Sequence, residues 1–267
     1  MSRIPAKFLA LRQAGRKALI PFITAGDPNP GFTVPALHAM VEAGADIIEL
    51  GVPFSDPMAD GPVIQKASER ALAHKMSLRK VLELVREFRQ ADQSTPIVLM
   101  GYLNPVEALG YQAFVEKAKE VGVDGVLTVD MPPEESEEFI RLLDQAGIAP
   151  IFLLAPNSTD ERIRKMGQLG RGYLYYVSLK GVTGASHLDL GDVERKLGEI
   201  RQLTSLPVGI GFGVKDAETA AAVGKLGDGV VVGSALVGKI EAAGDDTAAA
   251  LDGITVLLRS MRAALDA

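Results

Sequence analysis

The sequence predicts an α/β protein with a (β/α)8 barrel and an extra helix at its N-terminus. Short β-rich runs alternate eight times with longer amphipathic runs, within about 250 residues. Several of the short runs are apolar throughout, as expected for parallel strands that are buried on both faces. We therefore expect a single barrel domain over residues 1–267, and we prefer it to an open doubly wound sheet.

The predicted elements follow one another without a linker or a low-complexity run. An amphipathic segment at 3–14 comes first, and we expect it to cover the barrel floor. The apolar runs predict strands at 19–24, 46–50, 96–100, 125–128, 150–154, 173–177, 207–210 and 229–232. Amphipathic runs predict helices at 32–43, 77–91, 111–121, 134–146, 159–169, 189–203, 216–226 and 247–265, and a further helix begins near Pro62.

Composition excludes several classes of function. The net charge is -6 with both signs interspersed, so there is no basic patch for a nucleic acid. There is no cysteine, which excludes a disulfide or a thiolate site, and the three histidines have no ligand spacing, so we expect no metal. No run of 18 uncharged apolar residues predicts a membrane span. The N-terminus lacks the apolar core of a signal peptide, and we expect a cytoplasmic protein.

The most informative segment is the predicted strand at 46–50 with the loop that follows it. Glu49 stands near the end of this apolar strand, and the loop carries Asp56 and Asp60. An acid in an apolar strand is costly unless it is paired or used. Two carboxyl groups in unlike environments can divide acid and base work. The alternatives are a buried ion pair for Glu49, a turn or helix cap for Asp60, and a turn or partner contact for Asp56.

Glycines at the ends of the last strands predict a phosphate site. The strands at 207–210 and 229–232 run into glycine before a helix, and the loop after 173–177 is rich in glycine and threonine. Glycine lets the backbone approach an anion, and a helix N-terminus supplies free N–H groups. We expect the N–H groups near Gly184, Gly213, Gly233 and Ser234 to bind phosphate, with help from the Ser234 hydroxyl. Tight turns without a ligand are the alternative.

Aromatic side chains at strand ends suggest an apolar slot for a flat ligand. They are Phe22, Tyr102, Tyr175 and Phe212. Core filling is the alternative for each of them. The loops after the second and sixth strands are the longest, and we expect them to act as lids.

Several of these segments resemble one known family. They are ELGVPFSDPMADGPVIQKA around Glu49 and Asp60, PFITAGDP, GYLNP at 101–105, GVTG at 181–184 and the turn at 211–214. In order and spacing they resemble the tryptophan synthase alpha subunit over almost the whole chain. The resemblance implies a (β/α)8 lyase that cleaves indole-3-glycerol phosphate to indole and glyceraldehyde 3-phosphate.

The resemblance also implies a role for each matching residue. Glu49 is the general acid and base, Asp60 holds the indole N–H, and Tyr175 lies near the catalytic pocket. The family's positions around the indole ring and the lid correspond to Phe22, Tyr102, Leu127, Thr183 and Phe212. The family's phosphate site corresponds to Gly184, Gly213, Gly233 and Ser234. The sequence departs from many members at Met100 and Val129, where leucine and alanine are usual. It also departs at Lys180 on the lid, where other members place an arginine nearby.

The resemblance further implies a partner. It is a beta subunit that carries pyridoxal phosphate, in an α2β2 heterotetramer, and the alpha chain itself needs no cofactor. The contacts would come from residues 53–60, the loop after the third strand and the turn at 130–133. Three other functions stay open: a sugar-phosphate isomerase or epimerase, an inactive subunit that activates a partner, and a lyase that releases indole without a partner.

Overall fold

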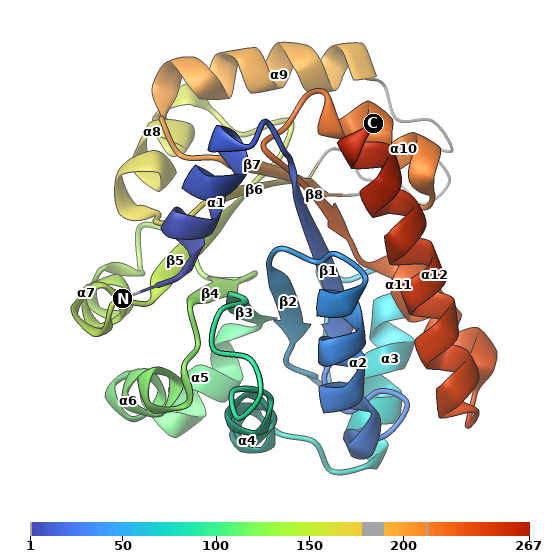
Figure 1. The fold of residues 1–267 in the computed structure, drawn as a ribbon. Helices are drawn as coiled ribbons and strands as arrows, with labels where there is room; N and C mark the ends of the chain where they lie inside the picture. Colours follow the sequence, from blue (N-terminus) through green and yellow to red (C-terminus); the bar gives the residue numbers. More distant parts are fainter. Residues whose placement is uncertain (1, 178–189, 212) are drawn as a thin grey trace.

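The computed structural model describes residues 2–177, 190–211 and 213–267. Within these ranges, eight parallel strands form a closed barrel in chain order, and β8 pairs with β1. Figure 1 shows the strands, and their bounds are β1 (Ala18–Thr24), β2 (Ile48–Gly51), β3 (Ile97–Gly101), β4 (Gly125–Thr128), β5 (Ala149–Leu154), β6 (Leu174–Val177), β7 (Val208–Gly211) and β8 (Gly229–Val232). The predicted (β/α)8 barrel is confirmed.

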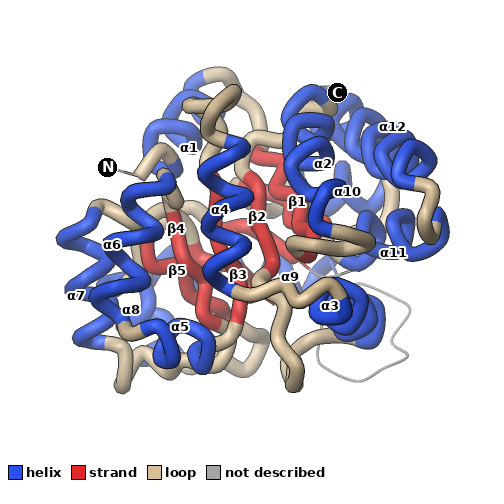
Figure 2. The backbone as a smooth tube through the Cα atoms, turned by 90° about the horizontal axis from the view of Figure 1, so that it is seen from below, coloured by secondary structure: helices blue, strands red, loops and turns tan. Residues whose placement is uncertain are grey.

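The helices surround the strands, as Figure 2 shows in a view turned by 90°. In the described part of the chain they are α1 (Ile4–Gln13), α2 (Pro30–Glu42), α3 (Pro62–Ala73), α4 (Leu78–Phe88), α5 (Leu103–Leu109), α6 (Tyr111–Val121), α7 (Glu137–Ala146), α8 (Asp160–Leu169), α9 (Leu190–Leu203), α10 (Ala217–Gly224), α11 (Ser234–Ala243) and α12 (Thr247–Asp266). The C-terminal helix α12 packs against α2, α10 and α11 (Figure 1).

Two helices of the structure have no predicted range. The short helix α5 lies where a loop is expected, although Pro105 stands in its first turn, where a missing N–H breaks no helical hydrogen bond. The helix α11 begins directly after Gly233 and contains Gly238, which weakens its helical pattern. Both helices follow strand ends, so both begin on the face of the barrel that carries the candidate site.

The core has two layers. The larger layer lies between the strands and the surrounding helices. The smaller layer fills the barrel and includes inward residues such as Val98, Leu127 and Tyr175. Ile4, Phe8 and Leu11 of α1 belong to this inner layer, so α1 covers the barrel floor as predicted.

Strand register determines which residues face the site. Phe22 of β1 lies opposite Glu49 of β2, and Glu49 lies opposite Val98 of β3. Two positions further along β1 and β2, Thr24 lies opposite Gly51. Because side chains alternate along a strand, Phe22 and Thr24 share the inward face of β1.

Candidate active site

Glu49 is the most deeply buried carboxyl group of the candidate site. Its side chain has 0% of its surface exposed. The hydroxyl of Tyr173 donates a hydrogen bond to Oε1, while Oε2 has no partner within the described ranges. Burial raises the pKa of Glu49 to about 8, and the hydrogen bond from Tyr173 acts in the opposite direction. No cation pairs with Glu49 among the described residues, so nothing in that part of the chain supports the ion-pair alternative.

Tyr173 is a site residue that the sequence interpretation misses. It stands directly before β6, in the inner core layer, and its ring contacts the Phe8 ring of α1 at 5.7 Å between centroids. The spacing of Tyr173 and Tyr175 is the signal that could have found it. Two residues separated by one position lie on the same face of a strand, and Tyr175 is already a candidate.

Tyr175 lies close to both candidate carboxyl groups. Burial raises its pKa first, and the charges of Glu49 and Asp60 raise it further. Gly211 of β7 makes room for it, since a Cβ at Gly211 would lie 2.1 Å from the Tyr175 hydroxyl oxygen. The structure therefore brings the three predicted catalytic residues together.

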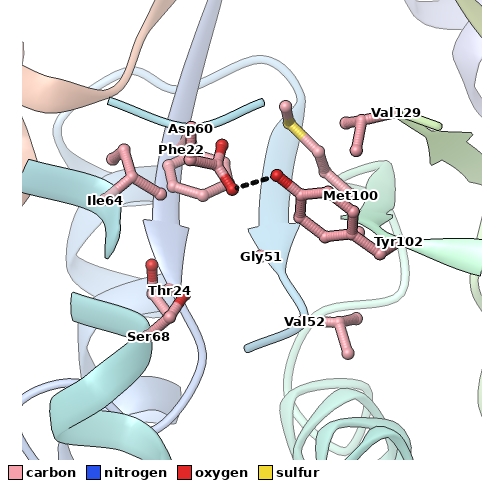
Figure 3. Close-up of a pocket in the computed structure, with 11 residues that line it drawn as sticks. Phe22, Thr24, Gly51, Val52, Asp60, Ile64, Ser68, Met100, Tyr102 and Val129 are labelled. Atoms are coloured by element: carbon pink, nitrogen blue, oxygen red, sulfur yellow. Dashed lines mark hydrogen bonds between the residues drawn. The ribbon is translucent and has the colours of Figure 1, made fainter. Parts of the chain in front are cut away.

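Asp60 is held by Tyr102. The Tyr102 hydroxyl donates to Asp60 Oδ2 at 2.9 Å (Figure 3). It also accepts a hydrogen bond from the Ala59 N–H at 3.0 Å. The Tyr102 ring stacks on Phe54, with 5.0 Å between centroids. Burial raises the pKa of Asp60, and the bond from Tyr102 opposes that shift. The N-cap of α3 is Gly61, so Asp60 is not the helix cap that the alternative reading proposes.

Two of the ring candidates, Phe22 and Tyr102, line a cavity beside Asp60. A cavity of about 20 Å³ is lined by Phe22, Gly51, Asp60, Met100, Tyr102 and Val129 among others (Figure 3). Glycine at position 51 leaves space for the Phe22 ring, because a Cβ at Gly51 would come within 2.6 Å of that ring. Leu127 is fully buried in the same inner core layer as Tyr175. Met100 and Val129, the two departures from the family pattern, both pack against that layer.

Within the described residues, the phosphate candidates lie at two turns. Gly233 is the N-cap residue of α11, and no side chain caps this helix. Its first residue, Ser234, is exposed. The N–H groups of a first helical turn have no helical acceptor, so this end of α11 can bind an anion.

The second turn differs from the prediction. Gly213 has a positive φ of 77° and is exposed, but α10 begins only at Ala217. Asp216 already caps α10, through a 2.8 Å bond from the Thr219 N–H. The expectation that glycine stands directly before a helix is right for β8 and wrong for β7.

Three predicted site residues, Thr183, Gly184 and Phe212, lie outside the described residues, as does Lys180. Within the described ranges, no three His, Asp or Glu side chains lie together as a metal site would require. None of the helices in those ranges is both long enough and apolar enough to cross a bilayer.

Comparison with known proteins identifies the family. A sequence model described as tryptophan synthase alpha chain matches residues 8–266. The tryptophan synthase alpha chain of Methylococcus capsulatus is 72% identical over 267 residues, which cover 100% of both chains. That of Laribacter hongkongensis is 60% identical with the same coverage.

Solved structures agree with the sequence comparison. The crystal structure of tryptophan synthase subunit alpha from Legionella pneumophila str. Paris has a TM-score of 0.93 at 44% identity, covering 100% of this chain and 99% of that one. A structure of Mycobacterium tuberculosis tryptophan synthase has a TM-score of 0.90 at 35% identity, with 99% and 98% coverage. By fold, by sequence and by the carboxyl groups at its barrel mouth, the chain belongs to the tryptophan synthase alpha chain family.

Proposed function

We propose that Glu49 and Asp60 are the catalytic groups for the reaction of this family. That reaction is the alpha reaction of tryptophan biosynthesis, in which a lyase cleaves indole-3-glycerol phosphate to indole and glyceraldehyde 3-phosphate. The observation that best supports the assignment is the fully buried Glu49, whose Oε2 has no partner within the described ranges. A buried polar atom without a partner lowers stability, so a structural role does not account for it.

The chemistry requires one group that first gives and then takes a proton. A pKa of about 8 keeps Glu49 mostly protonated at neutral pH. It protonates C3 of the indole ring, which becomes an indoleninium. The bond from C3 to the glycerol chain then breaks, and its electrons return to the ring. The hydroxyl on the adjacent carbon becomes the carbonyl group of the aldehyde, and its proton goes to the Glu49 carboxylate.

Asp60 has a different task because it is less buried than Glu49 and is fixed by Tyr102. Ionised, it accepts a hydrogen bond from the indole N–H and stabilises the positive charge that develops on the ring nitrogen. Tyr173 orients Glu49 through its hydrogen bond. Tyr175 fills the space beside both carboxyl groups and completes the wall of the site.

The substrate is held at both ends in this proposal. Phe22, Tyr102 and Leu127 contact the ring, with Thr183 and Phe212 added from the family resemblance. The phosphate binds at the uncapped N-terminus of α11, near Gly233 and Ser234, with Gly213 after β7 and with Gly184 added from the family resemblance. Holding the phosphate orients the bond that breaks.

The proposed partner is the beta subunit, in an α2β2 heterotetramer. Three neighbouring segments support one contact surface: the loop 53–60, the helix α5 and the turn 130–133. Hydrogen bonds connect them, from the Ala59 N–H to Tyr102 and from the Leu103 N–H to Asp130 Oδ1 at 2.8 Å. Met58 in this loop is 87% exposed. Because Asp60 belongs to the same loop, binding there would fix Asp60 and accelerate cleavage.

Three further expectations complete the proposal. Pyridoxal phosphate belongs to the beta subunit, and this chain needs no cofactor of its own for the proton transfers above. Residues 1–267 act as one domain, in support of which the described elements run from α1 to α12 around one barrel. The cytoplasmic location rests on the sequence.

The release of indole from indole-3-glycerol phosphate tests the proposal. Glu49→Gln is expected to lower kcat by about 10³-fold or more, and Asp60→Asn by about 10²-fold, since each group contributes to the transition state. Both variants should still bind a phosphate-bearing substrate analogue. A beta subunit added to the unmodified chain should raise the rate. Near-normal turnover by Glu49→Gln would refute the assignment, and rapid turnover that a beta subunit does not change would favour a lyase without a partner.

A further inference from the structure

The turn that carries Asp60 has one side toward the candidate site and one toward solvent. The Asp60 N–H donates to the Pro57 carbonyl oxygen at 3.0 Å, which closes a turn over residues 57–60. Met58 in this turn is 87% exposed, while Asp60 lines the cavity beside Phe22 (Figure 3). Because Met58 and Asp60 belong to one hydrogen-bonded turn, a displacement of the turn moves them together.

The side chain of Gln65, on α3, binds this turn at both of its ends. Its amide nitrogen donates to the Asp60 carbonyl oxygen at 2.9 Å and to the Pro57 carbonyl oxygen at 3.4 Å. A side-chain amide has two N–H donors, so one donor is available for each carbonyl group. The Gln65 N–H itself donates to the Gly61 carbonyl oxygen at 3.0 Å, so the side chain extends from a backbone that is fixed in α3.

Tyr102 binds different groups of the same turn. It holds the Asp60 carboxyl group and the Ala59 N–H, whereas Gln65 holds the two carbonyl groups at the ends of the turn. Tyr102 follows β3 directly and Gln65 belongs to α3, so two separate elements support the turn. The position of the Asp60 main chain therefore depends on a side chain that does not touch the Asp60 carboxyl group.

We infer that Gln65 is a positioning residue for Asp60, and that it keeps the turn at residues 57–60 in place when no partner covers Met58. This inference rests on the proposed role of Asp60 and on the proposed contact of the beta subunit with this loop. A partner that packs on Met58 holds the same turn from its outer side. The Gln65 amide and the beta subunit therefore stabilise the same position of Asp60, and a turn that is less often in that position binds the partner more weakly.

Gln65→Met tests the inference. Methionine has nearly the length and the helix propensity of glutamine, but it cannot donate a hydrogen bond. We expect kcat for indole release by the free chain to fall about tenfold, because Asp60 is in place for a smaller fraction of the time. KM should change by less than about twofold, since the phosphate binds at α11 and not at this turn.

Addition of a tryptophan synthase beta subunit distinguishes positioning from a purely structural role. At saturation, kcat of Gln65→Met should come within about threefold of the unmodified complex, because the partner then holds the turn. The Kd of Gln65→Met for the beta subunit should rise about tenfold, in parallel with the loss of kcat in the free chain. A role of Gln65 in stability alone would neither raise this Kd nor make the loss of kcat depend on the partner.

Gln93→Met is the matched control. The Gln93 side-chain amide also donates to a backbone carbonyl oxygen, that of Arg89, but near the barrel floor. Urea unfolding should show a similarly small loss of stability in both variants. Only Gln65→Met should change kcat and the Kd for the beta subunit.

Asp60→Asn and the unmodified chain separate failure of the inference from failure of the proposed function. If Asp60→Asn keeps full activity, the role of Asp60 is wrong, and if the beta subunit does not accelerate the unmodified chain, the proposed partner contact is wrong. If both of these expectations hold but Gln65→Met keeps the kcat of the free chain, the inference alone is wrong. A loss of kcat that persists undiminished in the complex would also overturn it. In the Asp60→Asn background, Gln65→Met should cause no further loss.

Discussion

Glu49 links the stability of the protein to pH. Its pKa is about 8 in the folded protein and 4.5 for the free group, so between these values the folded chain holds a proton that the unfolded chain has released. The free energy of unfolding therefore falls as pH rises through this window, and the contribution is fully present only below pH 4.5.

Glu49→Gln should remove this dependence, because the amide does not titrate. At pH 8 we expect the variant to exceed the unmodified protein in stability by roughly 3–5 kcal/mol, with a smaller difference of about 1 kcal/mol at pH 5. Urea unfolding at the two pH values measures it. An identical pH dependence in both proteins would show that the Glu49 pKa is not raised.

Tyr173→Phe tests whether the Tyr173 hydroxyl lowers the pKa of Glu49. The Tyr173 hydroxyl lowers the pKa of Glu49 against the larger effect of burial. Without it, that pKa should rise, and the alkaline limb of kcat/KM should move to higher pH, with kcat lower by about tenfold. Tyr176→Phe is the control, since Tyr176 packs in the outer core layer. If the alkaline limb of kcat/KM does not move in Tyr173→Phe, the Tyr173 hydroxyl does not lower the pKa of Glu49.

The sequence is most informative where a residue is costly in its place. Glu49 stands out because a carboxyl group in an apolar strand needs a reason, and Asp60 because it stands in the adjoining loop. Tyr173 does not stand out, since tyrosine is an ordinary residue of a strand. Its role depends on the hydrogen bond that its hydroxyl donates to Glu49, which only the three-dimensional structure reveals.

At the scale of elements, the N-terminus of α11 provides a test of the phosphate site. Ser234→Asp places a negative charge among the free N–H groups at the start of α11. This charge should repel phosphate. The helix dipole favours a negative charge at this end, so the aspartate should not destabilise the helix. We expect the Kd of a phosphate-bearing analogue to rise more than about tenfold, with stability unchanged within about 1 kcal/mol. Ser77→Asp makes the same change at the cap of α4 and should leave that Kd unchanged. Equal effects in the two variants would argue against the site.

Element prediction works for long amphipathic helices and fails for short ones. The spacing of apolar residues predicts α4, whose inner face is buried as the pattern indicates. The helix α5 is one that the pattern does not predict, because its seven residues include Asn104 and Pro105, which are typical of turns. Tertiary contacts decide such segments, and here the Leu103 N–H is held by Asp130.

At the scale of the whole molecule, Asp124 joins parts that are distant in sequence. Its carboxyl group binds Arg89 after α4 at 2.8 Å, Arg3 before α1 at 2.9 Å and the Ile97 N–H of β3 at 3.0 Å. The Asp124 side chain is buried. These bonds hold the N-terminal segment, α4 and β3 together at the barrel floor.

Asp124→Ala should therefore be costly. It leaves the buried Arg89 guanidinium without its carboxylate, and we expect a loss of about 3–5 kcal/mol in the free energy of unfolding. Glu120→Ala is the matched control, because Glu120 pairs with Arg86 at 2.9 Å on the exposed surface. It should cost less than about 1 kcal/mol. Similar losses in both variants would contradict the role assigned to Asp124.

The barrel as a whole is predictable because its signals repeat. Eight apolar runs, each followed by an amphipathic helix, leave few alternatives to a closed parallel sheet. The register is not predictable in the same way. The register places Phe22 opposite Glu49 and Thr24 opposite Gly51. It depends on contacts between strands, which the pattern of a single strand does not contain.

A crystal structure of the protein with a phosphate-bearing analogue of indole-3-glycerol phosphate would show whether Glu49 reaches the carbon that it protonates. We expect C3 of the ring within about 3–3.5 Å of Glu49 Oε2, the ring nitrogen against Asp60 and the phosphate at the N-terminus of α11. A ring bound away from Glu49, with Oε2 still lacking a partner, would contradict it.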